Sequence, residues 1–235
     1  MADLRALLHL VAALHFYYSI YSFTCIKFPP DMLPFGVNFG GIWKYLTIWN
    51  AALQAVYFTV ALMNDFIGTN EIMPRVKPTS RKLKDYLFAA FLFPGSLVVA
   101  ITFWAVMYID RELMMPKALD PIFPSWLSHA LHTNIVLFML LEIYTSFRQY
   151  PSRKAGLTGI LLFGVSYLVW LHVIRQYGGV WVYGVVEVLN LPLRIVFFAI
   201  ILGLAVGLYL FGELLNKGIW IREYWTLRSS TKKSK

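Results

Sequence analysis

Two histidines stand at the head of the apolar segment WLSHALHTNIVLFMLLEIY, which runs from Trp126 to Tyr144. On a helix, His129 and His132 lie about 60° apart around the axis and about 4.5 Å apart along it. Imidazoles so placed can form structural hydrogen bonds between helices, bind a metal ion, or act as a general base. The spacing alone leaves all three interpretations open.

A metal site has the least support from the spacing of these residues. Histidines that bind zinc from one helix are usually four residues apart, and these are three apart. No motif connects them to the further ligands that a metal would need, which would have to come from His9, His15, His172 or Glu142. A general base is chemically reasonable, because a poorly solvated site favours the neutral imidazole.

A second polar set occurs in the segment WKYLTIWNAALQAVYF, where Thr47, Asn50 and Gln54 follow one helical face. In a membrane protein such a face points into the bundle. Its simplest role is interhelical hydrogen bonding, which stabilises by about 0.6 to 2 kcal/mol per contact. A buried hydroxyl that meets an imidazole has a second possible role, as a nucleophile activated by a base.

The composition indicates that these residues lie in an integral membrane protein. The chain of 235 residues is 59% hydrophobic, with a mean hydropathy of +0.62. A span of about 20 apolar residues crosses a hydrocarbon core of about 30 Å. We therefore predict an all-α, polytopic transmembrane helix bundle in a single domain, 1–235, whose last part, 216–235, is a basic cytoplasmic tail. The six predicted spans are 6–26, 45–64, 86–109, 121–146, 155–174 and 195–215.

The basic residues predict the orientation of this bundle. With the N-terminus cytoplasmic, 15 of the 21 Lys and Arg residues fall in cytoplasmic segments. By the positive-inside rule both termini are then cytoplasmic. The net charge of +9 is mainly this topology signal, and no nucleic-acid module accompanies it. Plasma membrane and endoplasmic reticulum both suit the lengths of the spans.

Depth in the membrane connects the two polar sets. Thr47 and His132 both lie in spans entered from the non-cytoplasmic side, at depths of roughly 6 and 9 Å. The two side chains can therefore meet in one leaflet, as the minimum set for nucleophilic acyl transfer. Glu142 lies about 15 Å further along the same helix, so no carboxylate is placed to orient the imidazole.

Several motifs in order along the chain resemble one family of membrane proteins. They are WKYLT at Trp43, FLFPGSLVVAITFWAVMYIDREL at Phe91, PKALD at Pro116, WLSHALHT at Trp126, YPS at Tyr150, GLT at Gly156, WVY at Trp181 and LFGELLN at Leu210. Together they resemble the family of androgen-induced gene one protein and androgen-dependent TFPI-regulating protein. The likeness extends from about Gly41 to Trp220.

The resemblance implies a multi-pass membrane hydrolase of fatty acid esters of hydroxy fatty acids, a lipid substrate. It implies Thr47 as the nucleophile and His132 as its partner, without a metal or organic cofactor. Where the family pattern has asparagine before the first histidine, this chain has Ser128. His129 and Asn50 are predicted to support the site.

The predicted depth agrees with that substrate, whose scissile ester lies partway along an acyl chain and so below the headgroups. Two other functions remain open. One is a non-enzymatic membrane regulator or scaffold that affects a coagulation inhibitor. The other is a lipid-active metalloenzyme that uses His129 and His132.

Overall fold

The computed structural model describes residues 2–37 and 39–233, so residue 1, residue 38 and the last two residues of the predicted basic tail, 234–235, lie outside it. Within those ranges every regular element is helical and no strand occurs. The prediction of an all-α bundle with apolar, membrane-spanning helices is confirmed.

Five helical segments are long and apolar enough to cross a membrane. They are α1 (Ala2–Thr24) from Leu4 on, α2 (Leu46–Ile67), the continuous segment Thr79–Ile109, α7 (Arg153–Gly178) and α9 (Leu191–Ile219). A sixth span is present if the bent pair α5 (Ser125–His132) and α6 (Asn134–Thr145) is counted as one. The shorter elements are the 3₁₀ turns Gly41–Lys44, Arg111–Leu113 and Lys117–Leu119, with α8 (Gly184–Val188) and α10 (Ile221–Lys233).

The segment predicted as one span over 121–146 consists of two helices instead. Its helical part begins only at Ser125, because Pro124 holds an extended backbone conformation in front of it. The helix axis then turns by 41° between α5 and α6 at Thr133, directly after His132. His132 is therefore the last residue of a short helix, α5, at a bend in the chain.

The segment Thr79–Ile109 contains a local change of helix type. It is composed of α3 (Thr79–Leu87), the π-helical turn Phe88–Leu92 and α4 (Phe93–Ile109). Pro94 follows the π turn and cannot donate a hydrogen bond to the carbonyl of residue 90. A widened turn in front of the proline accommodates the missing bond without ending the helix.

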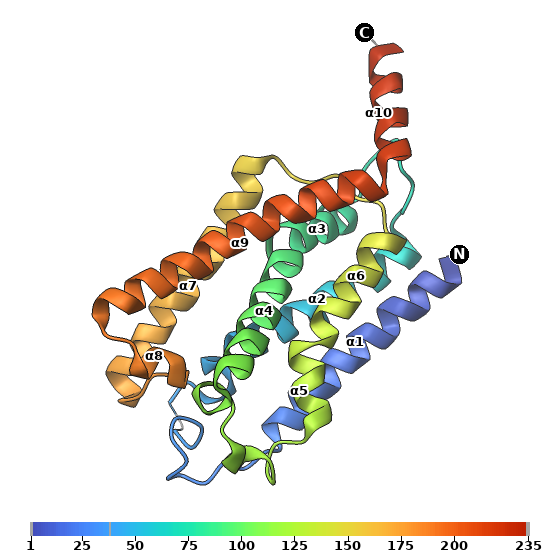
Figure 1. The fold of residues 1–235 in the computed structure, drawn as a ribbon. Helices are drawn as coiled ribbons and strands as arrows, with labels where there is room; N and C mark the ends of the chain where they lie inside the picture. Colours follow the sequence, from blue (N-terminus) through green and yellow to red (C-terminus); the bar gives the residue numbers. More distant parts are fainter. Residues whose placement is uncertain (1, 38, 234–235) are drawn as a thin grey trace.

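The bundle brings both chain ends to one end and most connecting loops to the other (Figure 1). Helix α1 packs against α2, and α4 contacts α2, α6 and α9, while α7 packs on α9. Side chains cap the two longest helices at their starts. Ser152 accepts from the N–H of Ala155 before α7, and Asn190 accepts from the N–H of Leu193 before α9. The end with the chain termini is called the terminal end, and the end with the turns Gly41–Lys44 and Arg111–Leu113 is called the loop end.

Candidate active site

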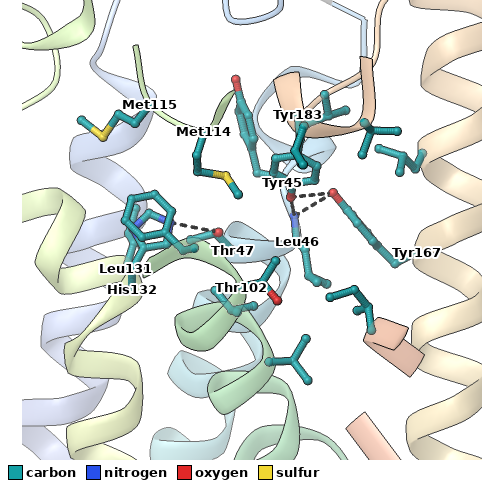
Figure 2. Close-up of a pocket in the computed structure, with 18 of the residues that line it drawn as sticks. Tyr45, Leu46, Thr47, Thr102, Met114, Met115, Leu131, His132, Tyr167 and Tyr183 are labelled. Carbon is teal, nitrogen blue, oxygen red and sulfur yellow. Dashed lines mark hydrogen bonds between the residues drawn. The ribbon is translucent and has the colours of Figure 1, made fainter. Parts of the chain in front are cut away.

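Thr47 and His132 face each other at the loop end of the bundle. Thr47 lies in the first turn of α2, and His132 is the last residue of α5. Their side chains meet with Oγ1 of Thr47 and Nε2 of His132 3.3 Å apart (Figure 2). This distance is within hydrogen-bonding reach, as expected from the matched depth of the two residues.

The imidazole of His132 is held on its far side by the backbone. Nδ1 donates to the carbonyl oxygen of Ser128 at 2.9 Å, one turn earlier in α5. The ring also stacks on Phe103 with centroids 3.5 Å apart and an angle of 7° between the planes. The proton on Nδ1 leaves Nε2 with its lone pair directed at the Thr47 hydroxyl.

The main-chain carbonyl of Ser128 therefore orients the His132 imidazole, a role that a carboxylate would otherwise serve. This carbonyl partner was not predicted from the sequence, although the position of Ser128 four residues before His132 on the same helix was a signal for it. Because the carbonyl makes the bond, the difference between Ser128 and the asparagine of the family pattern does not remove it. The Ser128 hydroxyl instead lies 3.9 Å from the sulfur of Met115.

Two tyrosines hold the start of α2. The N–H of Leu46 donates to the hydroxyls of Tyr167 at 3.1 Å and Tyr183 at 3.0 Å (Figure 2). Those hydroxyls are 2.8 Å apart, and Tyr167 donates to the carbonyl of Lys44 at 2.9 Å. Burial raises the pKa of Tyr183, so its hydroxyl stays neutral. The tyrosines thereby fix the residue next to Thr47.

Lys44 fixes the loop that leads into α2. Its buried ammonium donates to the carbonyls of Pro34 at 2.9 Å, Phe35 at 3.1 Å and Val37 at 2.7 Å. Burial lowers the pKa of Lys44 to about 8. Phe35 lines the same cavity as Thr47, so Lys44 holds part of the cavity wall.

The Thr47–His132 pair faces a cavity of about 150 Å³. Most of the side chains on its wall are apolar. They include residues of α4, α7 and α9, and the chain between α4 and α5 contributes Met114, Met115, Leu119 and Phe123. Among the described residues, the Thr102 hydroxyl on this wall is a buried group without a hydrogen-bond partner. The cavity is thus suited to alkyl chains and has few polar groups beyond the pair.

The other residues predicted to support the site lie apart from the pair. His129 is exposed, with its Nδ1 3.2 Å from the Thr133 hydroxyl and its ring stacked on Trp104. Asn50 lies one turn deeper in α2, where Oδ1 accepts from Gln54 at 3.1 Å and from Ser96 at 3.3 Å. Between the polar residues predicted on α2 and those predicted on α5, the hydrogen bond found among the described residues is the one from Thr47 to His132.

Among the described residues, the candidate ligands for a metal do not gather into one site. His9 and Glu142 contact each other at 2.8 Å, and His172 bonds to the carbonyl of Leu168 in α7. Within residues 2–37 and 39–233, no group of three or more His, Cys, Asp or Glu side chains could hold a metal ion.

The chain matches the profile of one protein family, described as FAR-17a/AIG1-like protein, over residues 4–217. It is 37% identical to androgen-induced gene 1 protein of Homo sapiens, over 80% of this chain and 82% of that protein. It is 39% identical to androgen-dependent TFPI-regulating protein of Mus musculus, over 77% of this chain and 78% of that protein. A membrane protein of Schizosaccharomyces pombe is 24% identical over 83% of this chain. No solved structure matches the chain.

Proposed function

Since the chain belongs to the FAR-17a/AIG1-like family, we propose that it is a membrane hydrolase of lipid esters in which Thr47 is the nucleophile and His132 the base. The observation that carries the proposal is the 3.3 Å contact between Thr47 Oγ1 and His132 Nε2 on the wall of an apolar cavity. A hydroxyl beside an oriented, neutral imidazole is the pairing that nucleophilic acyl transfer requires.

The reaction has two steps. His132 Nε2 accepts the proton of the Thr47 hydroxyl while Oγ1 forms a bond to the carbonyl carbon of the ester. The bond from that carbon to the alcohol oxygen then breaks, and the alcohol leaves with the proton from His132. Water, deprotonated by the same imidazole, next attacks the acyl-threonine, so that the fatty acid is released and Thr47 recovers its hydrogen.

Helix α2 supplies the electrostatics for the negative charge that develops on the carbonyl oxygen. Thr47 lies in the first turn of α2, where backbone N–H groups carry the positive end of the helix dipole. Negative charge on an oxyanion beside this turn is favoured, most strongly where water is excluded.

Fatty acid esters of hydroxy fatty acids are the proposed substrates. The resemblance drawn from the sequence motifs implies this class, and the largely apolar wall of the cavity suits the alkyl groups on either side of such an ester. With both termini cytoplasmic, the site lies in the opposite leaflet of the plasma membrane or the endoplasmic reticulum.

Purified variants test this assignment with one such ester as the substrate. Thr47→Ala removes the attacking oxygen and His132→Ala removes the base, so each is expected to lose on the order of 10²-fold or more in kcat/KM. Thr47→Ser keeps the hydroxyl and should retain part of the activity. Thr59→Ala is the matched control, because Thr59 lies in the same helix and, among the described residues, its hydroxyl bonds to a helix carbonyl and to exposed Tyr17.

Each outcome has a distinct meaning for the proposal. Full hydrolysis by a folded Thr47→Ala protein would exclude the threonine nucleophile and leave a structural role for its hydroxyl. Complete loss of activity on treatment of the wild type with a chelator would favour a metalloenzyme instead. A folded wild type that neither hydrolyses the esters nor reacts with a covalent hydrolase probe would favour a regulator or scaffold.

A further inference from the structure

A second, smaller cavity lies beside the one that contains the Thr47–His132 pair. Its volume is about 60 Å³, and its wall is formed by α2, α4, α7 and α9. Apart from the Asn50 amide and the Tyr167 hydroxyl, the side chains on this wall are aliphatic or phenylalanine. No charged side chain lines it, so it is suited to an alkyl chain and not to a polar group.

The second cavity is the inward continuation of the first. The two share seven lining residues, including Leu46, Val98 and Tyr167. The residues that belong to the second cavity alone lie further from the loop end. Asn50 is about 6 Å along α2 from Leu46, and Gly95 is about 10 Å along α4 from Thr102 of the first cavity.

We propose that this second cavity binds the fatty acyl chain of the ester, with the carbonyl carbon at Thr47 where the two cavities meet. This inference rests on the proposed hydrolase function and adds to it where each half of the substrate binds. The hydroxy fatty acid carries a carboxylate, whose burial without a partner is costly. That half therefore occupies the first cavity with its carboxylate towards the loop end, and the acyl chain, with no polar terminus, enters the second cavity.

Two small residues on facing helices line this cavity. Gly164 of α7 lies opposite Leu202 of α9, and a Cβ at Gly164 would be 2.7 Å from Leu202 Cδ2. Ala205, one turn further along α9, is buried on the same wall. Larger side chains at Gly164 or Ala205 would fill this cavity from opposite sides and leave the Thr47–His132 pair untouched.

The length of the acyl chain should then control the rate. Each methylene that is buried contributes about fourfold to binding, so a cavity that takes up more of the acyl chain favours longer acyl groups. A blocked cavity keeps the reaction at Thr47 but loses this preference. Gly164 and Ala205 are therefore specificity-determining positions, distinct from the catalytic residues.

The test compares two esters of the same hydroxyoctadecanoic acid, one with a hexadecanoyl and one with a butanoyl group. Gly164→Leu and Ala205→Leu should each lower kcat/KM for the hexadecanoyl ester by on the order of tenfold or more. The butanoyl ester should be hydrolysed at the wild-type rate. Gly164→Ala should fall between, since the end of the Leu202 side chain can move aside for one methyl group.

Matched controls are available on the outer face of α9. An added Cβ at Gly203 or Gly207 meets nothing within 4 Å, so Gly203→Leu and Gly207→Leu add the same side chain outside the cavity. Their ratio of hexadecanoyl to butanoyl hydrolysis should equal that of the wild type. If Gly164→Leu and Ala205→Leu leave this ratio unchanged in folded protein, the acyl chain does not bind in the second cavity.

A binding experiment keeps the inference separate from catalysis and from any folding defect. An ester that carries a diazirine near the middle of its hexadecanoyl chain is photolysed in the Thr47→Ala protein, in which the second cavity is unaltered. Crosslinks should fall on the α7 or α9 segments around Gly164 and Ala205. Crosslinks only at Met114 or Met115 would overturn the inference, whereas undiminished hydrolysis by Thr47→Ala would overturn the proposed function and not this binding position.

Discussion

The two ends of the bundle both bury polar side chains, but they join them in different ways. At the terminal end, Glu142 accepts from Tyr57 at 2.6 Å, Arg148 at 2.9 Å and His9 at 2.8 Å, and Lys84 lies 3.8 Å away. His9 also contacts Asp65 at 2.6 Å. At the loop end, Thr47 and His132 share one contact of 3.3 Å, and the Thr102 hydroxyl has no partner among the described residues.

This difference separates groups that hold the helices from groups that can react. The buried Glu142 carboxylate has partners on α1, α2, α3 and the chain after α6, so it links these segments. Glu142 does not line either of the two cavities. A hydroxyl and an imidazole with one mutual bond, on a cavity wall, can exchange that bond for a substrate. We therefore expect substitutions at the terminal end to change stability and those at the loop end to change activity.

The largest effect on stability is expected for Glu142→Gln. The substitution leaves the cations of Arg148 and Lys84 buried without their carboxylate, which costs about 3 to 5 kcal/mol of unfolding free energy. Thermal or denaturant unfolding in detergent measures this loss of stability. Exposed Glu187→Gln is the matched control, with less than about 1 kcal/mol expected. A Glu142→Gln protein as stable as the wild type would show that the two ends do not differ in this way.

The next largest effect is expected on activity, at the loop end of the bundle. A nucleophile and its base act as one unit, so Thr47→Ala combined with His132→Ala should be hardly worse than either change alone, at a loss on the order of 10²-fold or more. The measurement is kcat/KM for all three variants at equal amounts of folded protein. Losses that multiply in the double variant would mean that the two residues act independently.

The apolar, membrane-spanning helices and a matched depth for Thr47 and His132 could be predicted from the sequence, because both follow from local counts. Charge-free runs mark the membrane crossings, and the number of residues from a span's entry gives depth. The bend after His132 could not be predicted from such counts, because the residue at the bend is Thr133 and not a helix-breaking Gly or Pro. Likewise, His129 and His132 are one turn apart, and only the packing of α5 makes one exposed and the other buried.

The supports of Thr47 were missed for a different reason. The N–H of Leu46 bonds to Tyr167 and Tyr183, which are separated from it by 121 and 137 positions along the chain. No local sequence pattern encodes such a pairing. Tyr183 and Lys44 both lie in motifs that carried the family resemblance, WVY and WKYLT, which marked them without indicating their partners. Their contributions are tested by the two remaining predictions.

Removal of the Tyr183 hydroxyl should lower activity moderately. Tyr183→Phe deletes one acceptor of the Leu46 N–H and a bond to Tyr167, so the first turn of α2 loses a restraint worth about 1 kcal/mol. We expect kcat to fall by roughly fivefold, with a smaller change in KM, because Thr47 is displaced while the cavity stays. Exposed Tyr177→Phe is the matched control. A fall in stability with unchanged kcat would assign Tyr183 a purely structural role.

The smallest effect is expected at Lys44, and it depends on pH. Its pKa of about 8 lies below its ordinary value of 10.5, so the unfolded chain holds the proton more tightly between these values and linkage through Lys44 raises stability there as pH rises. Loss of the proton nevertheless removes one of the three N–H donors that hold the loop carbonyls of Pro34, Phe35 and Val37. Wild-type activity should therefore fall by about twofold as pH passes about 8, without a loss of fold stability. Lys44→Met has no such donor at any pH, so its activity should be low and should not change near pH 8. Comparison of the pH–activity profiles of Lys44→Met and the wild type removes the contribution of other titrating groups. Parallel profiles for the two proteins would show that the loop at this end of the bundle does not depend on the charge of Lys44.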